Sequence, residues 1–124
     1  MKAIETQDAP AALGPYSQAV KNNGILYVSG QLGIDVNTGL LAPSFQGQAE
    51  LVFENLKNIL TAAGLTFKDV VKVSIFLDDM SSFPALNTLY GKIFDQKPYP
   101  ARETIQVAKL PLNGAIEISL IAME

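Results

Sequence analysis

The chain contains neither cysteine nor histidine among its 124 residues. The missing thiols exclude disulfides and thiolate nucleophiles, and no metal site built from Cys and His can form. Without an imidazole base, acid–base chemistry must come from carboxylates, tyrosine, lysine, main-chain groups or water. Carboxylates alone can hold a metal, but the sequence has no acidic cluster, so we expect neither a metal nor another cofactor.

A surplus of basic residues is also missing. Nine Lys and Arg stand against 12 Asp and Glu, which gives a net charge of −3, and the basic residues form no cluster. Nucleic-acid-binding proteins usually carry a basic surplus or stripe, so we expect no nucleic-acid partner. A single well-placed arginine is still enough to bind a small carboxylate.

Long hydrophobic runs are absent as well. The apolar stretches are too short to span a membrane, and the N-terminus lacks the apolar run of a signal peptide. We therefore expect a soluble cytoplasmic protein with no membrane partner. Apolar residues make up 48% of the chain, which predicts one core and a single domain over 1–124.

Two amphipathic helices are predicted. Apolar residues at helical spacing predict the first over about 44–63, and Gly64 fits the left-handed stop after it. Ser81 or Ser82 is the predicted N-cap of the second helix. Two prolines in the segment 95–100 end this helix.

Five strands are predicted from apolar alternation. They cover residues 19–20, 25–29, 70–77, 102–107 and 115–122. The first two form a hairpin, because Asn22-Asn23-Gly24 tolerates the positive φ angles of a tight turn. Two helices can cover only one face of such a sheet. The predicted fold class is therefore α+β, with the other face wet or covered by another chain.

The alternation within the fourth strand bears on a candidate site. It places Arg102 and Thr104 on one face and Ile105 and Val107 on the other. If Ile105 and Val107 meet the helices, Arg102 and Glu117 both lie on the uncovered face. The pattern thus predicts one arginine and one glutamate together on that side.

Arg102 and Glu117 are the residues best suited to chemistry. A guanidinium offers a planar fork of donors that matches a carboxylate. Glu117 lies between two isoleucines, which favours a raised pKa and proton transfer near neutral pH. Each also has an ordinary interpretation, Arg102 as a strand-end arginine reaching solvent and Glu117 as a polar position on a half-exposed strand.

Three further positions suit a pocket. Tyr16 lies in the loop Gly14-Pro15-Tyr16-Ser17 and can aim a phenol, Gly30 follows Ser29 and lets a ligand approach the backbone, and Asn87 flanks the second helix. A turn, a bend and a surface amide explain them equally well. No P-loop, dinucleotide fingerprint or nucleophile elbow is present.

Taken together and in order, these pieces resemble the RidA/YjgF family along nearly the whole chain. The matching pieces are Gly14-Pro15-Tyr16-Ser17-Gln18-Ala19, Val28-Ser29-Gly30-Gln31, Asn37-Thr38-Gly39, Ala63-Gly64-Leu65, Val70-Val71-Lys72, Asn87, Pro100-Ala101-Arg102, Val107-Ala108-Lys109-Leu110-Pro111 and Ile116-Glu117-Ile118. The resemblance implies a chorismate-mutase-like fold, with one mixed sheet and two helices on one face. It also implies a barrel-like homotrimer with its sites between neighbouring subunits.

The resemblance further implies an activity. Family members hydrolyse reactive enamines and imines such as 2-aminoacrylate, 2-iminobutanoate and 2-iminopropanoate to 2-keto acids and ammonia. By this resemblance Arg102 binds the carboxylate, Glu117 positions or activates water, Tyr16 joins the catalytic group, and Ser29, Gly30, Asn87 and Thr104 bind the substrate.

Two residues depart from the family pattern. Glu103 stands where the family usually has a small residue, and Thr104 where active members often have cysteine. A regular strand points Glu103 away from Arg102, whereas a bent strand would let it compete for the guanidinium. Three alternatives stay open: a carboxylate-binding trimer without turnover, an endoribonuclease or translation inhibitor, and a chaperone-like or purely structural trimer. Glu103 bears on the first of them.

Overall fold

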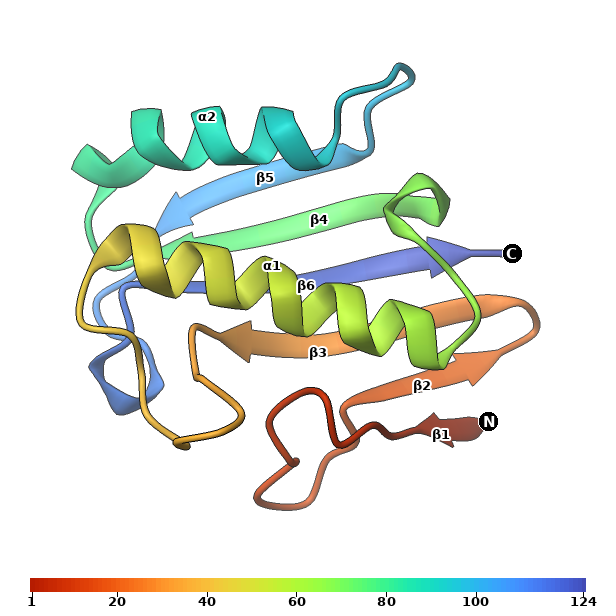
Figure 1. Ribbon diagram of the computed structural model, residues 1–124. Helices are drawn as coiled ribbons and strands as arrows, with labels where there is room; N and C mark the ends of the chain where they lie inside the picture. Colours follow the sequence, from red (N-terminus) through yellow and green to blue (C-terminus); the bar gives the residue numbers. More distant parts are fainter.

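The computed structural model describes residues 1–124 as a mixed six-stranded sheet with two helices on one face (Figure 1). The strands are β1 (Lys2–Ile4), β2 (Ala19–Asn22), β3 (Ile25–Leu32), β4 (Val70–Leu77), β5 (Ala101–Gln106) and β6 (Ile116–Met123), and the helices are α1 (Phe45–Ala62) and α2 (Phe83–Ile93). Three 3₁₀ segments cover Phe67–Asp69, Met80–Ser82 and Pro111–Asn113. The strand order is β1-β2-β3-β6-β4-β5, with only β4 and β5 parallel. The α+β prediction is confirmed, although β1 was not predicted.

The hairpin of β2 and β3 forms as predicted. Asn23 and Gly24 have φ angles of 51° and 76°, which are the positive values that a tight two-residue turn needs. Strand β3 is longer than predicted, because it continues past Ser29 to Leu32. A register shift between Val28 and Gln31 lets it do so.

Both helices begin and end within about two residues of their predicted limits. The Ser44 hydroxyl caps α1 by accepting a hydrogen bond from the Gly47 N–H at 3.0 Å, and Gly64 follows α1 with a φ of +77°. Helix α1 contacts β3, β6 and α2. Ser82 precedes α2 but makes no side-chain cap.

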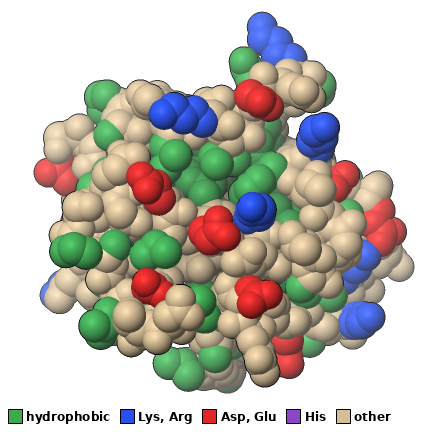
Figure 2. Space-filling model, viewed as in Figure 1, with side chains coloured by type: hydrophobic (Ala, Val, Ile, Leu, Met, Phe, Trp, Pro, Cys, Tyr) green, Lys and Arg blue, Asp and Glu red, His purple; other side chains and the backbone are tan.

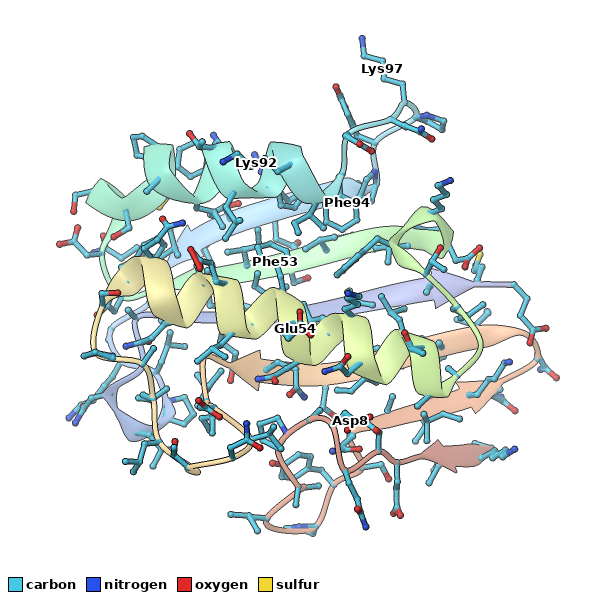
Figure 3. All side chains as sticks on the ribbon, in the orientation of Figure 1. Asp8, Phe53, Glu54, Lys92, Phe94 and Lys97 are labelled. Atoms are coloured by element: carbon cyan, nitrogen blue, oxygen red, sulfur yellow. The ribbon has the colours of Figure 1, made fainter.

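An aromatic cluster joins the two helices. It consists of Phe53, Phe67, Tyr90 and Phe94, with ring centroids 4.6–6.4 Å apart. Phe53 on α1 and Phe94 beyond α2 both point into the space between the helices (Figure 3). Hydrophobic side chains fill the same space on the surface (Figure 2). These edge and tilted ring contacts add to the burial that fixes α2 on the sheet.

Strand β4 departs from strict alternation at its start. Val73, Ile75 and Leu77 are fully buried beneath the helices. The pairing of β4 with β6 shifts between Val70 and Lys72, and this irregularity turns Val70 into the core. In a regular strand Val71 would share the face of Val73, but it is 40% exposed.

The opposite face of the sheet carries no helix (Figure 1). It presents side chains from β4, β5 and β6, among them Ser74, Phe76, Glu103, Ile105 and Glu117. We call it the open face. Neither α1 nor α2 has the length and apolar content needed to cross a bilayer.

Candidate active site

Arg102 lies on the helix side of the sheet and not on the open face. It pairs with Val73 of β4, whose side chain is buried beneath the helices, and Thr104 pairs with the equally buried Ile75. The prediction that Ile105 meets the helices is therefore wrong, since Ile105 is 47% exposed on the open face. Strand β5 is an edge strand, and at an edge both faces are partly wet. Its apolar pattern consequently does not fix which face points inward.

Helix α2 supplies a cradle for Arg102. Its Nη1 donates a 2.8 Å hydrogen bond to Asn87 Oδ1. The guanidinium carbon lies 4.6 Å from the ring centroid of Tyr90 and 5.6 Å from that of Phe83. Phe83, Asn87 and Tyr90 are spaced by four and three residues, so they share one stripe of α2. The structure thus brings the predicted residues Arg102 and Asn87 together in a cleft of about 460 Å³.

Glu117 lies on the open face of β6. Its neighbours Ile116 and Ile118 are fully buried beneath the helices, so the alternation directs Glu117 to the opposite side. Partial burial raises the pKa of the Glu117 carboxyl above its ordinary value. The carboxyl therefore binds a proton more readily than a solvated glutamate does.

Gly30 makes room for this carboxyl. A Cβ atom at position 30 would lie 2.8 Å from Cδ of Glu117. No ordinary carbon–carbon contact is that short, so an alanine would displace the glutamate side chain. The glycine is needed here for space and not for a positive φ.

Tyr16 and Ser29 complete a second, larger cleft. The Ser29 hydroxyl donates to the carbonyl of Ser17 at 2.6 Å, and the Ser29 N–H donates to the carbonyl of Gln18 at 3.0 Å. These bonds tie the loop that carries Tyr16 to β3. The resulting cleft of about 1460 Å³ is lined in part by Tyr16, Ser29, Gly30 and Glu117.

Gln18 is a positioning residue that the sequence analysis missed. Its buried amide accepts a 2.8 Å hydrogen bond from the Thr6 N–H and donates one of 2.8 Å to the Pro10 carbonyl. It thereby holds the N-terminal segment against the loop of Tyr16. A glutamine in a polar loop gives no sequence signal of burial, and the signal lies only in its place within the motif after Ser17.

Glu103 does not compete for Arg102. It lies on the open face, where it accepts a hydrogen bond from the Ser74 hydroxyl and forms an ion pair of 3.4 Å with Lys72. The Ser74 hydrogen bond, with a smaller contribution from Lys72, lowers the pKa of the Glu103 carboxyl. Strand β5 is thus regular at this point, and the expectation that Glu103 points away from Arg102 is confirmed.

Thr104 joins neither cleft. It shares the helix side of β5 with Arg102, as predicted, but it is not among the residues that line the two cavities. Its hydroxyl oxygen is buried and has no hydrogen-bond partner within the protein. The contact of Thr104 with a ligand stays a prediction.

The predicted site is thus divided into two half-sites. The first, which we call the arginine half-site, contains Arg102 and Asn87, and the second, the glutamate half-site, contains Tyr16, Ser29, Gly30 and Glu117. Within one chain, Arg102 and Glu117 point to opposite faces of the sheet, and neither of the two clefts contains both. The acidic side chains form no group of three or more that could hold a metal ion.

Comparison with known proteins shows the family to which the chain belongs. A sequence model of the family described as Endoribonuclease L-PSP matches residues 6–124. The chain belongs to this family, which is the RidA/YjgF family. Mouse 2-iminobutanoate/2-iminopropanoate deaminase is 44% identical over 99% of this chain and 91% of its own.

Solved structures of the RidA/YjgF family have the same fold. RidA from an Antarctic Psychrobacter species superposes with a TM-score of 0.96 at 48% identity, and the match covers all of both chains. E. coli TdcF with bound serine superposes with a TM-score of 0.95 at 41% identity over 100% of this chain and 99% of its own. The RidA/YjgF resemblance seen in the sequence is confirmed along the whole chain.

Substitution of Gly30 by alanine tests the glutamate half-site without attacking the core. If the Glu117 carboxyl takes part in a reaction, we expect that activity to fall at least about tenfold, since the new methyl group displaces the carboxyl from its place. The free energy of unfolding should change little, because the displaced group is the end of a flexible side chain.

Lys57→Ala is the control for this substitution. Lys57 is exposed on α1 and lines neither cleft, so that variant should keep wild-type activity. Full activity of Gly30→Ala would show that the Glu117 carboxyl takes no part in the reaction.

Proposed function

We propose that this chain is an imine deaminase that hydrolyses 2-aminoacrylate, 2-iminobutanoate and 2-iminopropanoate to 2-keto acids and ammonia. The observation that carries the proposal is the pair of complementary half-sites, one with an oriented guanidinium and one with a half-buried carboxyl of raised pKa. The activity named for the mouse relative supports the same chemistry.

The active site is completed between two subunits of a cyclic homotrimer. The argument is geometric: Arg102 and Glu117 of one chain face opposite sides of its sheet, so they cannot grip one small molecule. A neighbouring copy removes the conflict, because its glutamate half-site can meet the arginine half-site of the first. Each of the three clefts then contains one guanidinium and one carboxyl from different chains.

The Arg102 guanidinium binds the substrate carboxylate. The guanidinium has five N–H donors, and one of them is bound to Asn87, which leaves four for the ligand. Two parallel hydrogen bonds from the planar fork to the carboxylate fix both the position and the plane of the imino acid. The neighbouring subunit's Tyr16 and Ser29 would border the reacting carbon.

Glu117 of the neighbouring subunit acts on water. An enamine first tautomerises to the imine, whose carbon is already electrophilic. The carboxylate takes one proton from water as the oxygen bonds to that carbon, and the electron pair of the C=N bond moves to nitrogen. The carboxyl then returns the proton to nitrogen, and the carbinolamine collapses to the keto acid and ammonia. The raised pKa of Glu117 suits both transfers near neutral pH.

The direct test is keto-acid formation from enzymatically generated 2-iminobutanoate, with semicarbazide trapping unhydrolysed imine. We expect faster hydrolysis than in buffer at every pH near neutrality. As the pH falls through the raised pKa of Glu117, the carboxylate becomes protonated and the enzymatic rate should fall. Glu117→Gln should remove this acid limb together with roughly 10²–10⁴-fold of the rate. No acceleration over buffer at any pH would refute the proposal.

Carboxylate binding without turnover is the second candidate. Arg102 and its cradle would serve it equally well. It would gain support from a Glu103 that competes for Arg102, but Glu103 is bound to Ser74 and Lys72 on the other face. Saturable binding of 2-oxobutanoate without any acceleration of imine hydrolysis would favour this candidate.

A further inference from the structure

Arg102 is the only arginine of the chain, and its side chain is held on three sides by α2. Asn87 fixes one end of the guanidinium by a hydrogen bond, and the rings of Phe83 and Tyr90 contact it at 5.6 and 4.6 Å. The shorter ring distance belongs to Tyr90. An arginine on an exposed edge strand otherwise samples many rotamers, at a cost in entropy when a ligand orders it.

Tyr90 is itself immobilised from behind. It is 8% exposed, and its ring packs on Phe94 at 4.6 Å and against Phe53 at 6.4 Å. The ring is therefore part of the aromatic cluster between α1 and α2. A cation over a rigid ring has a fixed place, whereas a cation over a mobile ring does not.

We propose that Tyr90 is a positioning residue that orders the Arg102 guanidinium for a planar carboxylate ligand through the face of its ring. Only the identity of the ligand rests on the proposed function. The ordering of the side chain is a property of the chain alone. Tyr90 therefore acts through Arg102, and it does not touch the reacting atoms.

The hydroxyl group of Tyr90 separates the role of the ring from that of the phenol. Its oxygen is buried and has no hydrogen-bond partner within the protein. Phenylalanine keeps the ring and removes this unpartnered group, so Tyr90→Phe should preserve both the order of Arg102 and the stability of the fold. Leucine removes the ring, so Tyr90→Leu should release Arg102.

The first measurement is the ¹⁵N relaxation of the Arg102 Nε–H, which a chain with one arginine presents as a single assignable signal. We expect a rigid side chain in the wild type and in Tyr90→Phe, and a flexible one in Tyr90→Leu. Phe67→Leu is the matched control for a loosened cluster, because Phe67 contacts Phe53 and Phe94 but not Arg102. Equal rigidity of Arg102 in Tyr90→Leu would overturn the inference.

The second measurement is the binding of 2-oxobutanoate by titration calorimetry, together with imine kinetics. The dissociation constant and KM should rise about 3- to 30-fold in Tyr90→Leu, which is the range of a cation–π contact, with kcat changed much less. Tyr90→Phe should keep the dissociation constant and KM at their wild-type values. A wild type that binds 2-oxobutanoate without hydrolysing imines, and in which Tyr90→Leu still weakens binding, would refute the deaminase while leaving this inference intact. Unchanged binding in Tyr90→Leu would refute the inference alone.

Discussion

Replacement of Arg102 by alanine is expected to lower kcat/KM for 2-iminobutanoate by at least about 100-fold. The reason is the loss of two charge-assisted hydrogen bonds to the substrate carboxylate, each worth about 1.5–3 kcal/mol. Most of the loss should fall on KM, with a further loss in kcat because an unanchored imine is poorly placed for water attack. The measurement is keto-acid formation against substrate concentration.

Two further variants make this result specific. Arg102→Lys keeps the positive charge but loses the planar fork, so it should recover only part of the activity. Lys92→Ala removes an exposed cation from α2, the helix that holds the Arg102 side chain, and should leave kcat/KM unchanged (Figure 3). All three variants should retain the melting temperature within a few degrees, since Arg102 and Lys92 are exposed. An active Arg102→Ala variant would show that the carboxylate is bound elsewhere.

Two inactive variants, Arg102→Ala and Glu117→Gln, are expected to restore activity when they assemble together. In a cyclic trimer with two kinds of chain, one of the three clefts combines an intact Arg102 with an intact Glu117 from its neighbour. Mixed trimers should therefore hydrolyse imine at roughly one third of the wild-type rate. The variants would be co-expressed with different affinity tags and purified through both.

A variant that carries both substitutions in one chain is the control for this experiment. Paired with wild type in the same way, it leaves one intact cleft in trimers with two wild-type chains and none in trimers with one. At equal amounts of these two trimers the rate should be roughly one sixth of wild type, about half that of the complementing pair. Paired with either single variant, it should leave every cleft broken and give no recovery. Failure of the two single variants to complement each other would place Arg102 and Glu117 in separate sites and would remove the shared cleft from the proposal.

The helices and the hairpin could be predicted from sequence because local physics determines them. The apolar stripe of α1, the Ser44 cap and the Asn23-Gly24 turn each act within a few residues. The RidA/YjgF motifs likewise identified the family, and they made Arg102, Glu117 and the residues around them candidates for a site. These signals require no knowledge of which elements lie side by side.

The orientation of β5 could not be predicted in the same way. Ile105 suggested an inward face, but the pairing of Arg102 with Val73 reverses that choice. The pairing is a long-range property, set by where β5 docks on β4 after α2. Tyr90 and Gln18 escaped notice for a related reason. An aromatic residue on an apolar stripe and an amide in a loop reveal their contacts only after the chain has folded.

The Ser74–Lys72–Glu103 group on the open face bears on which surfaces can cover that face. Three polar side chains satisfy one another there among apolar neighbours such as Phe76 and Ile105. A flat apolar surface that covered these side chains would remove their hydrating water without supplying compensating hydrogen bonds, which costs free energy. We therefore expect this group to disfavour association with an unmatched apolar surface and to favour a neighbour that offers polar groups of its own.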